Sequence, residues 1–370
     1  MVLTMRGFVS IYLDIFRVMA AMGVFLSHAE QHSGFAVIIP GVSFMHFDHK
    51  LVIIFFVISG YVIAASASRP DRTLANYTAD RLARLSSVVI PALFLTYVLD
   101  GVGSMVSPGV YSFVAPHWQF FRFLANLLYC QQFWFLCINP SSNTAMWSLG
   151  YEFWYYVLFG IWIFVETKAA KILLLGVTAV LIGPKILLLL PAWAMGAGAF
   201  YAANAWRCSF RNSIWLFAGT GLAAIAALVF EDQFGLNNGR AGLPPLYYSS
   251  NYWGDNLFAA IVAIHFVCCG LFSRCLTGDF ERHAMVKIIR WAAGHTFSLY
   301  VYHMPLLFFV LAIVRYDTGN VFEVLAAMSV VLLIIAALSK VTEERYPALR
   351  MLLRRSFGTF AGAVPRLATK

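Results

Sequence analysis

Charged side chains interrupt stretches of this chain that are otherwise apolar. Asp14 and Arg17 lie in the middle of the first apolar segment, and His28 stands at its far end. Glu152 lies within another long aromatic run. A charged group in a membrane helix is costly to insert, so it is usually paired and functional. Because a histidine beside a carboxylate can take the proton of a hydroxyl group, these residues predict a chemically active site with His28 and Glu152 as partners.

The spacing of these residues limits which of them can touch. Arg17 and His28 are eleven positions apart, so on a straight helix they lie about 20° from the same face. They are separated by roughly 16 Å along the axis, so they can line one cavity but cannot contact each other. Asp14 precedes Arg17 by three positions, and such a pair lowers the cost of burying either charge. A purely structural ion pair is the alternative interpretation.

Three further positions are candidates for binding. His303 lies in the middle of an apolar run, where it serves either as a second proton-transfer group or as a packing hydrogen bond. Arg81 and Arg84 are one helical turn apart just before the third apolar segment. Paired guanidiniums suit phosphate groups, although basic residues also anchor helices at a membrane surface. The small step Ser59-Gly60 either allows close helix approach or leaves room for a slender ligand chain.

The composition is that of a membrane protein. Hydrophobic residues make up 61% of the 370 and charged residues 12%, against about 25% charged in soluble domains. The formal charge of +9 would suggest nucleic acid as a partner of a soluble protein. Here it indicates basic cytoplasmic loops against a lipid bilayer, and no nucleic acid is expected. The six cysteines show no metal-ligand spacing, so no metal is expected either.

The predicted fold is an all-α, polytopic membrane bundle of about ten transmembrane helices. A cytoplasmic N-terminus places 20 Lys and Arg residues inside and 4 outside, provided that the apolar stretch 118–138 does not cross. Both termini are then cytoplasmic, with a membrane domain over 1–345 and a basic tail over 346–370. The outer loops 29–50, 106–146 and 232–255 suit a sugar-like molecule, although aromatic belts at the membrane interface have a similar composition. The ten expected spans are 8–28, 51–66, 86–105, 147–166, 172–190, 191–206, 214–231, 256–273, 291–314 and 320–339.

Five short motifs, in this order, resemble those of the acyltransferase-3 family of integral membrane O-acyltransferases. That family includes bacterial enzymes that acylate O-antigen, exopolysaccharide, lipo-chitooligosaccharide and macrolide sugars. Three positions depart from the usual pattern: Ile15 replaces the glycine after Asp14, Tyr61 stands where phenylalanine is more usual, and Pro91 falls later than the usual proline after the arginine pair. The motifs are Leu13-Asp14-x-x-Arg17 with His28, Phe55-Phe56-Val57-Ile58-Ser59-Gly60-Tyr61, Arg81-x-x-Arg84-Leu85, Trp147-Ser148-Leu149-x-x-Glu152 and Ser298-Leu299-Tyr300-Val301-Tyr302-His303.

The resemblance implies an enzyme that moves an acyl group, most often acetyl, from acyl-CoA to a hydroxyl of an extracytoplasmic or lipid-linked glycan. It implies His28 as general base, Glu152 as the group that orients it, and Arg17 as a donor-binding or oxyanion-stabilising residue. An acyl-histidine relay is as compatible with these roles as direct transfer. A bacterial inner membrane is the expected location. The expected donor-binding residues are Arg81, Arg84 and Ser59, and the expected substrate-positioning residues are His303, Asp14, Trp147 and Tyr300.

A second class of function remains open on these residues. In a proton-coupled transporter or glycan exporter, the same buried charges would form a proton or substrate pathway. The chain shows no repeated half and no matched pair of interrupted helices, which such transporters often have. Dependence on acyl-CoA distinguishes the two classes, because only the acyltransferase consumes it.

Overall fold

The fold is known from a computed structural model, which describes residues 7–33, 43–44, 47–70, 72–230, 245–276, 278 and 280–363. Within these residues the chain is helical and contains no strand. This confirms the all-α prediction. The helices are α1 (Phe8–Ser33), α2 (Asp48–Ala67), α3 (Leu74–Val106), α4 (Gln119–Leu127), α5 (Trp147–Phe164), α6 (Lys168–Ile182), α7 (Pro184–Ala205), α8 (Phe210–Val229), α9 (Tyr252–Ser273), α10 (Ala284–Ala293), α11 (Thr296–Val314), α12 (Val321–Val341) and α13 (Tyr346–Ala363).

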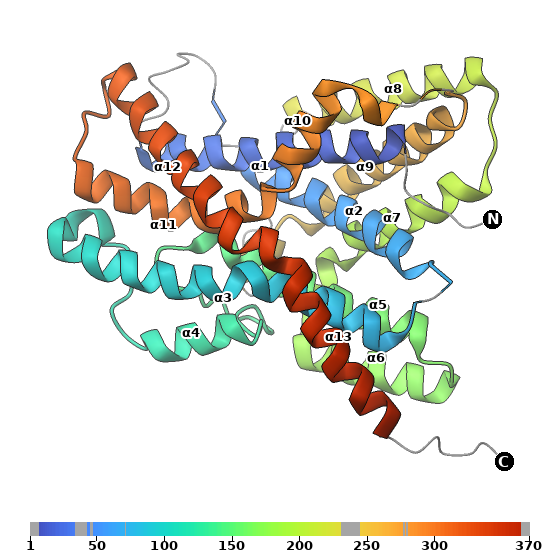
Figure 1. Cartoon of the computed structure of the whole chain (residues 1–370), viewed down its shortest axis with the longest axis horizontal. Coiled ribbons are helices and arrows are strands. Elements are labelled where there is room, and N and C mark those ends of the chain that lie inside the picture. Colours follow the sequence, from blue (N-terminus) through green and yellow to red (C-terminus); the bar gives the residue numbers. More distant parts are fainter. Residues whose placement is uncertain are drawn as a thin grey trace.

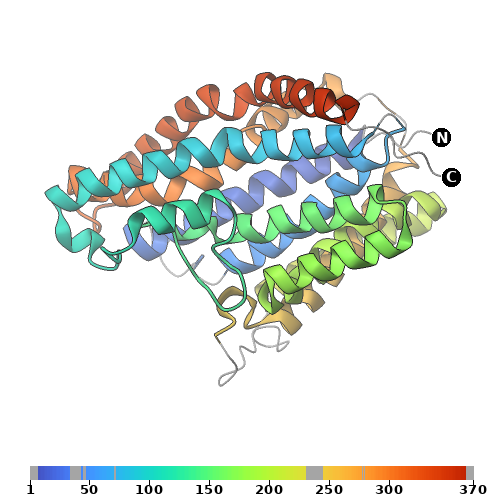
Figure 2. The same ribbon diagram turned by 90° about the horizontal axis from the view of Figure 1, so that it is seen from below.

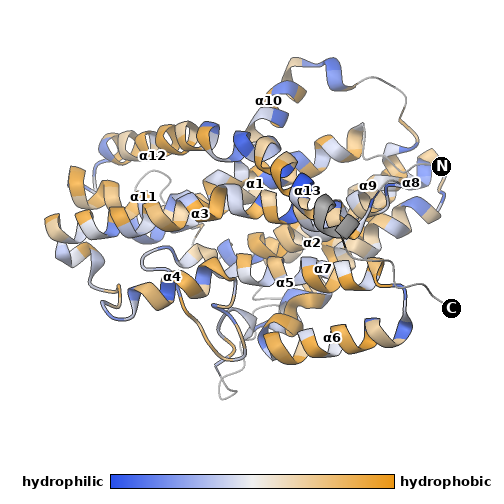
Figure 3. Ribbon diagram, turned by 60° about the horizontal axis from the view of Figure 1, so that its bottom comes forward, coloured by the Kyte–Doolittle hydropathy of each residue, from blue (hydrophilic) through white to orange (hydrophobic). Residues whose placement is uncertain are grey.

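The long helices lie side by side in one bundle, and the start of α1 and the end of α13 point toward the same end of it (Figures 1 and 2). Eight helical segments among the described residues are long and apolar enough to cross a membrane. The outer helices carry exposed apolar side chains, including Leu173 and Val180 on α6 and Leu333 on α12. The ribbons of α6 and α12 are mostly orange in Figure 3, the colour of hydrophobic residues, and exposed apolar side chains on such helices are what a lipid-facing protein requires.

The predicted break between the fifth and sixth spans is in the wrong place. We expected a turn at Pro191, but Pro191 lies inside α7 and the chain turns at Gly183 instead. Gly183 has φ +79°, a conformation that favours glycine. Pro184 then occupies the first turn of α7, where its missing N–H has no cost. The two helices are therefore α6 (168–182) and α7 (184–205), and α7 is the one long enough to count among the eight candidate spans.

Two other predicted boundaries are corrected by local geometry. The third helix begins at Leu74 rather than at 86, because the Thr73 hydroxyl caps it by accepting a hydrogen bond from the Asn76 N–H at 3.2 Å. The predicted span 291–314 is divided at Gly294, which separates α10 from α11. The first correction matters for function, since it places Arg81 and Arg84 on α3 itself.

The stretch 118–138 does not form a membrane-crossing helix, as expected from the charge distribution. Its helix, α4, has nine residues and is about 14 Å long, half of what a bilayer core needs. The chain beyond it folds back onto α7, where the buried Lys185 ammonium donates to the Gln132 side-chain oxygen at 2.8 Å and to the Leu136 carbonyl. Lys185, for which the sequence suggested no role, thus fixes this loop against the bundle.

Helices α2 and α7 pack unusually closely through two glycines. A Cβ atom at Gly60 would lie 2.0 Å from the Trp193 carbonyl oxygen, and one at Gly196 would lie 2.0 Å from the Val57 carbonyl oxygen. Neither backbone can move aside without separating the helices. Of the two interpretations of the Ser59-Gly60 step, close helix approach therefore explains the glycine.

The residues expected as a basic tail begin with a long helix. Helix α13 packs along α3 and crosses the face of the bundle diagonally (Figure 1). Residues 364–370, and residues 232–244 of the outer loop 232–255, lie outside the described residues.

Candidate active site

One cavity gathers most of the residues that the sequence singled out. It has a volume of about 460 Å³ and lies between α1, α2, α3, α5, α10 and α11. Four arginines and two carboxylates face it, giving a formal net charge of +2, and apolar side chains of α2 line another part of its wall. The expected site residues that line it are Asp14, Arg17, Ser59, Arg81, Arg84, Glu152 and Tyr300.

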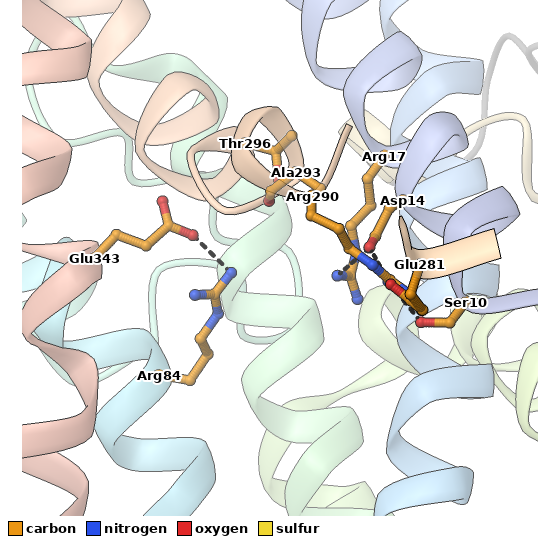
Figure 4. Close-up of polar contacts among 9 residues, drawn as sticks. All are labelled: Ser10, Asp14, Arg17, Arg84, Glu281, Arg290, Ala293, Thr296 and Glu343. Atoms are coloured by element: carbon orange, nitrogen blue, oxygen red, sulfur yellow. Dashed lines mark hydrogen bonds and ion pairs between the residues drawn. The ribbon is translucent and has the colours of Figure 1, made fainter. Parts of the chain in front are cut away.

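The arginines of this cavity are only partly paired. Arg84 donates to Glu343 at 2.7 Å, and Arg17 lies 3.5 Å from Asp14, which confirms the expected contact within α1 (Figure 4). Arg81 faces the ring of Tyr156 at 5.9 Å. Guanidinium groups gathered in a hollow with fewer carboxylates favour an anionic ligand.

Arg290 on α10 is a cavity residue that the sequence did not indicate. It forms an ion pair with Asp14 and donates to Ser10 at 2.7 Å and to Glu281 at 2.6 Å (Figure 4). Burial lowers the pKa of the Arg290 guanidinium, but the hydrogen bonds to Glu281 and Asp14 outweigh it and raise the pKa. Asp14 therefore holds α1 against α10, and no spacing along the chain could have shown this.

Glu152 does not orient His28, contrary to our expectation. Its carboxylate accepts a hydrogen bond from the Ser59 hydroxyl at 2.6 Å and a second one from the hydroxyl of Tyr156, one turn further along α5. The indole N–H of Trp193 donates to the same Ser59 oxygen at 3.1 Å. Glu152 thus ties α5 to α2 in the wall of the cavity.

His28 pairs instead with His303, which lies 275 positions away in the chain. The Nδ1 atom of His28 is 2.8 Å from the Nε2 atom of His303, and the two rings are nearly parallel. On its other side, His28 Nε2 lies 3.5 Å from the carboxylate of Asp48 at the start of α2. Asp48 is therefore the carboxylate partner of His28, and the sequence analysis missed it.

The histidine pair adjoins the cavity rather than lining it. Arg17 lines the cavity, but His28 does not. The expectation that both residues line one cavity is therefore met for Arg17 alone. Tyr300 connects the two regions: it lines the cavity, and its ring is 6.1 Å from that of His303. Its hydroxyl is fixed by hydrogen bonds with Ser148 at 2.7 Å and the Ala145 carbonyl at 2.8 Å.

Trp147 lies outside the cavity in a stack of rings. Its indole is sandwiched between His49, at 5.7 Å, and Tyr248, at 4.2 Å, and is 6% exposed. His49 is held by Asp255, which also binds the buried Lys50 at 2.9 Å. Trp147 thus packs the start of α5 against His49, the residue that follows Asp48 in the chain.

Comparison with known proteins identifies the class of protein to which this chain belongs. The model of the acyltransferase-3 family, described as an acyltransferase domain, matches residues 10–340. The chain belongs to this family and is a membrane acyltransferase. No curated protein and no solved structure matches the chain significantly. Among the described residues, no group of three potential ligands could hold a metal ion.

Proposed function

We propose that this protein transfers an acyl group, acetyl in the simplest case, from acyl-CoA to a hydroxyl of a glycan. The observation that supports this best is the arginine-lined cavity with a hydrogen-bonded histidine pair beside it. An acyl-CoA carries its negative charge at one end and its thioester at the other. A cavity with guanidiniums in one part of its wall and a base beyond Tyr300 matches that distribution of charge.

The donor's phosphates bind at Arg81 and Arg84 in this proposal. Both belong to α3, three positions apart, so their planar groups can grip one pyrophosphate together. The apolar wall formed by Val52, Phe55 and Val62 suits the uncharged chain that links the phosphates to the thioester. Arg17, which lies 3.5 Å from Asp14 and lines the same cavity, is a further donor-binding group in this proposal.

The chemical step we propose is direct transfer. His28 takes the proton of the acceptor hydroxyl as the hydroxyl oxygen bonds to the thioester carbonyl carbon. The carbonyl oxygen becomes an oxyanion in the tetrahedral intermediate. When the carbon–sulfur bond breaks, the CoA sulfur leaves with the electron pair and takes the proton from His28. The products are the acylated glycan and free CoA, and His28 returns to its initial state.

The same proposal places the protein in a bacterial inner membrane with both termini in the cytoplasm. The donor then enters from the cytoplasmic side, where acyl-CoA is made, and the glycan approaches from the opposite side. The strong excess of basic residues on one side of the predicted spans supports this orientation.

The test is single-turnover transfer from radiolabelled acetyl-CoA by the purified chain in lipid nanodiscs, with an envelope polysaccharide extract as acceptor. We expect label on the glycan, and a loss of roughly 10²- to 10⁴-fold in the H28A variant. The matched control is H117A, which removes an exposed histidine outside the site. A wild-type protein that neither binds acetyl-CoA nor transfers label would overturn the proposed donor.

A further inference from the structure

A second, smaller cavity lies next to the first. It has a volume of about 250 Å³ and lies between the end of α2, the first turns of α3 and the start of α13. The two cavities share three wall residues, Val62, Arg81 and Tyr346. The two cavities are therefore neighbours, and Arg81 belongs to the wall of both.

The smaller cavity is strongly basic. Four arginines line it, Arg69, Arg72, Arg81 and Arg350, with Asp80 as the one carboxylate in its wall, so its formal net charge is +3. Like charges in a confined space repel one another unless an anion joins them. The charge of this cavity is therefore better explained by a ligand than by packing.

Asp80 holds these arginines in fixed positions. Its carboxylate accepts hydrogen bonds from Arg72, Arg350 and Arg354, all at 2.7–2.8 Å. Arg72 is further fixed by a bond to the Ser66 hydroxyl at 3.0 Å, and its side chain is 5% exposed. One carboxylate binds three guanidiniums, so it fixes their positions but neutralises only one of their three positive charges. Arg69, by contrast, is exposed at the rim of the cavity.

The terminal helix α13 takes part in this site because of Asp80. Arg350 and Arg354 are four positions apart on α13, so they lie on one face and reach the same carboxylate on α3. This contact closes the cavity on the side of α13, which crosses the bundle there (Figure 1). The C-terminal helix therefore supplies a wall of the site.

We propose that the smaller cavity is a second phosphate subsite that takes a terminal phosphate monoester of the donor nucleotide. On an acyl-CoA this group is the 3′-phosphate, while Arg81 and Arg84 hold the pyrophosphate and the larger cavity holds the thioester arm. The inference rests on the proposed function, since it assigns one further part of the same donor. It predicts that the protein distinguishes CoA from 3′-dephospho-CoA.

The experiment uses calorimetry to measure the equilibrium binding of CoA and of 3′-dephospho-CoA to the full chain in phosphatidylcholine nanodiscs. Binding needs no acceptor, so the result does not depend on the identity of the glycan. We expect wild-type protein to bind CoA about tenfold more tightly than 3′-dephospho-CoA, the effect of one charge-assisted contact. This ratio of the two affinities should fall to about twofold or less in the R69Q and R350Q variants.

The matched control is R207Q, which removes an exposed arginine outside both cavities. It should keep the full preference for CoA, because a general loss of positive surface charge does not discriminate between the two nucleotides. Arg69 is exposed, so R69Q tests the contact without disturbing the Asp80 cluster.

Four results would overturn the inference. Equal affinity of wild-type protein for the two nucleotides would contradict the second subsite, and so would an unchanged ratio of affinities in R69Q and R350Q. Neither result would contradict the proposed donor site at Arg81 and Arg84. Failure of both nucleotides to bind removes the proposed donor as well. A lipid headgroup has the same phosphate chemistry. If phosphatidylglycerol in the nanodiscs weakens CoA binding to wild type but not to R69Q, the cavity belongs to a lipid instead.

Discussion

His28 Nδ1 and His303 Nε2 lie 2.8 Å apart, and this contact determines which nitrogen of His28 can act as a base. His303 Nδ1 is 3.0 Å from the Leu299 carbonyl oxygen, which can only accept a hydrogen bond. The proton of neutral His303 is therefore on Nδ1, and its Nε2 must accept from His28 Nδ1. The lone pair of His28 is then on Nε2, the atom that faces Asp48.

The first prediction follows from this order of protons. H303F removes the acceptor for His28 Nδ1–H, so His28 loses its fixed tautomer, and we expect kcat to fall about 10- to 100-fold. The KM for acetyl-CoA should change little, because His303 does not line the donor cavity. H303Q, whose side-chain oxygen can accept the same hydrogen bond, should recover part of kcat. Equal losses in H303F and H303Q would show that His303 only fills space.

Asp48 gives the second prediction. Its carboxylate is 3.5 Å from His28 Nε2, so it stabilises the imidazolium that forms when His28 takes up a proton. We expect D48N to lower kcat about tenfold or more, measured as single-turnover rate at saturating acetyl-CoA. D317N, at an exposed aspartate in another loop, is the control and should match wild type. A normal rate in D48N would mean that His28 works without a carboxylate partner.

The third prediction concerns Glu152 and Ser59. Since the two side chains share one hydrogen bond of 2.6 Å, their effects should not add. We expect E152Q and S59A each to raise the KM for acetyl-CoA a few-fold, and the double variant to be little worse than the more affected single one. Steady-state kinetics of the four proteins complete the cycle. Strict additivity would contradict the contact. An effect on kcat alone would restore Glu152 to the role we first expected.

The fourth prediction tests the contact of α2 with α7. A methyl group at Gly196 would meet the Val57 carbonyl at 2.0 Å, so G196A should lower the thermal unfolding temperature and cost about 1–3 kcal/mol or more. Gly198, on the same helix, has open space at its Cβ position, and G198A is the control. Tryptophan fluorescence in detergent measures both transitions. Equal stability of the two variants would show that the helices do not approach this closely.

The sequence by itself determined the features that depend on neighbours along the chain. Hydropathy indicated the membrane helices, and helical spacing brought Asp14 to Arg17 and put Arg81 beside Arg84, because both pairs are three positions apart on one helix. The nine-residue α4 was also foreseen as a non-crossing segment, since the basic residues that follow it fix the side of every later loop.

Only the tertiary structure decided which partners the charged side chains take. Glu152 binds Ser59 and Tyr156, and His28 binds His303, because these contacts depend on the depth and rotation of one helix against another. Neither quantity is encoded in a local pattern of residues. The turn at Gly183 instead of Pro191 has the same origin. Pro191 continues inside α7, whereas Gly183 has φ +79° and a Cβ atom there would lie 2.7 Å from the Cα atom of Trp134, a contact that no local pattern of residues reveals.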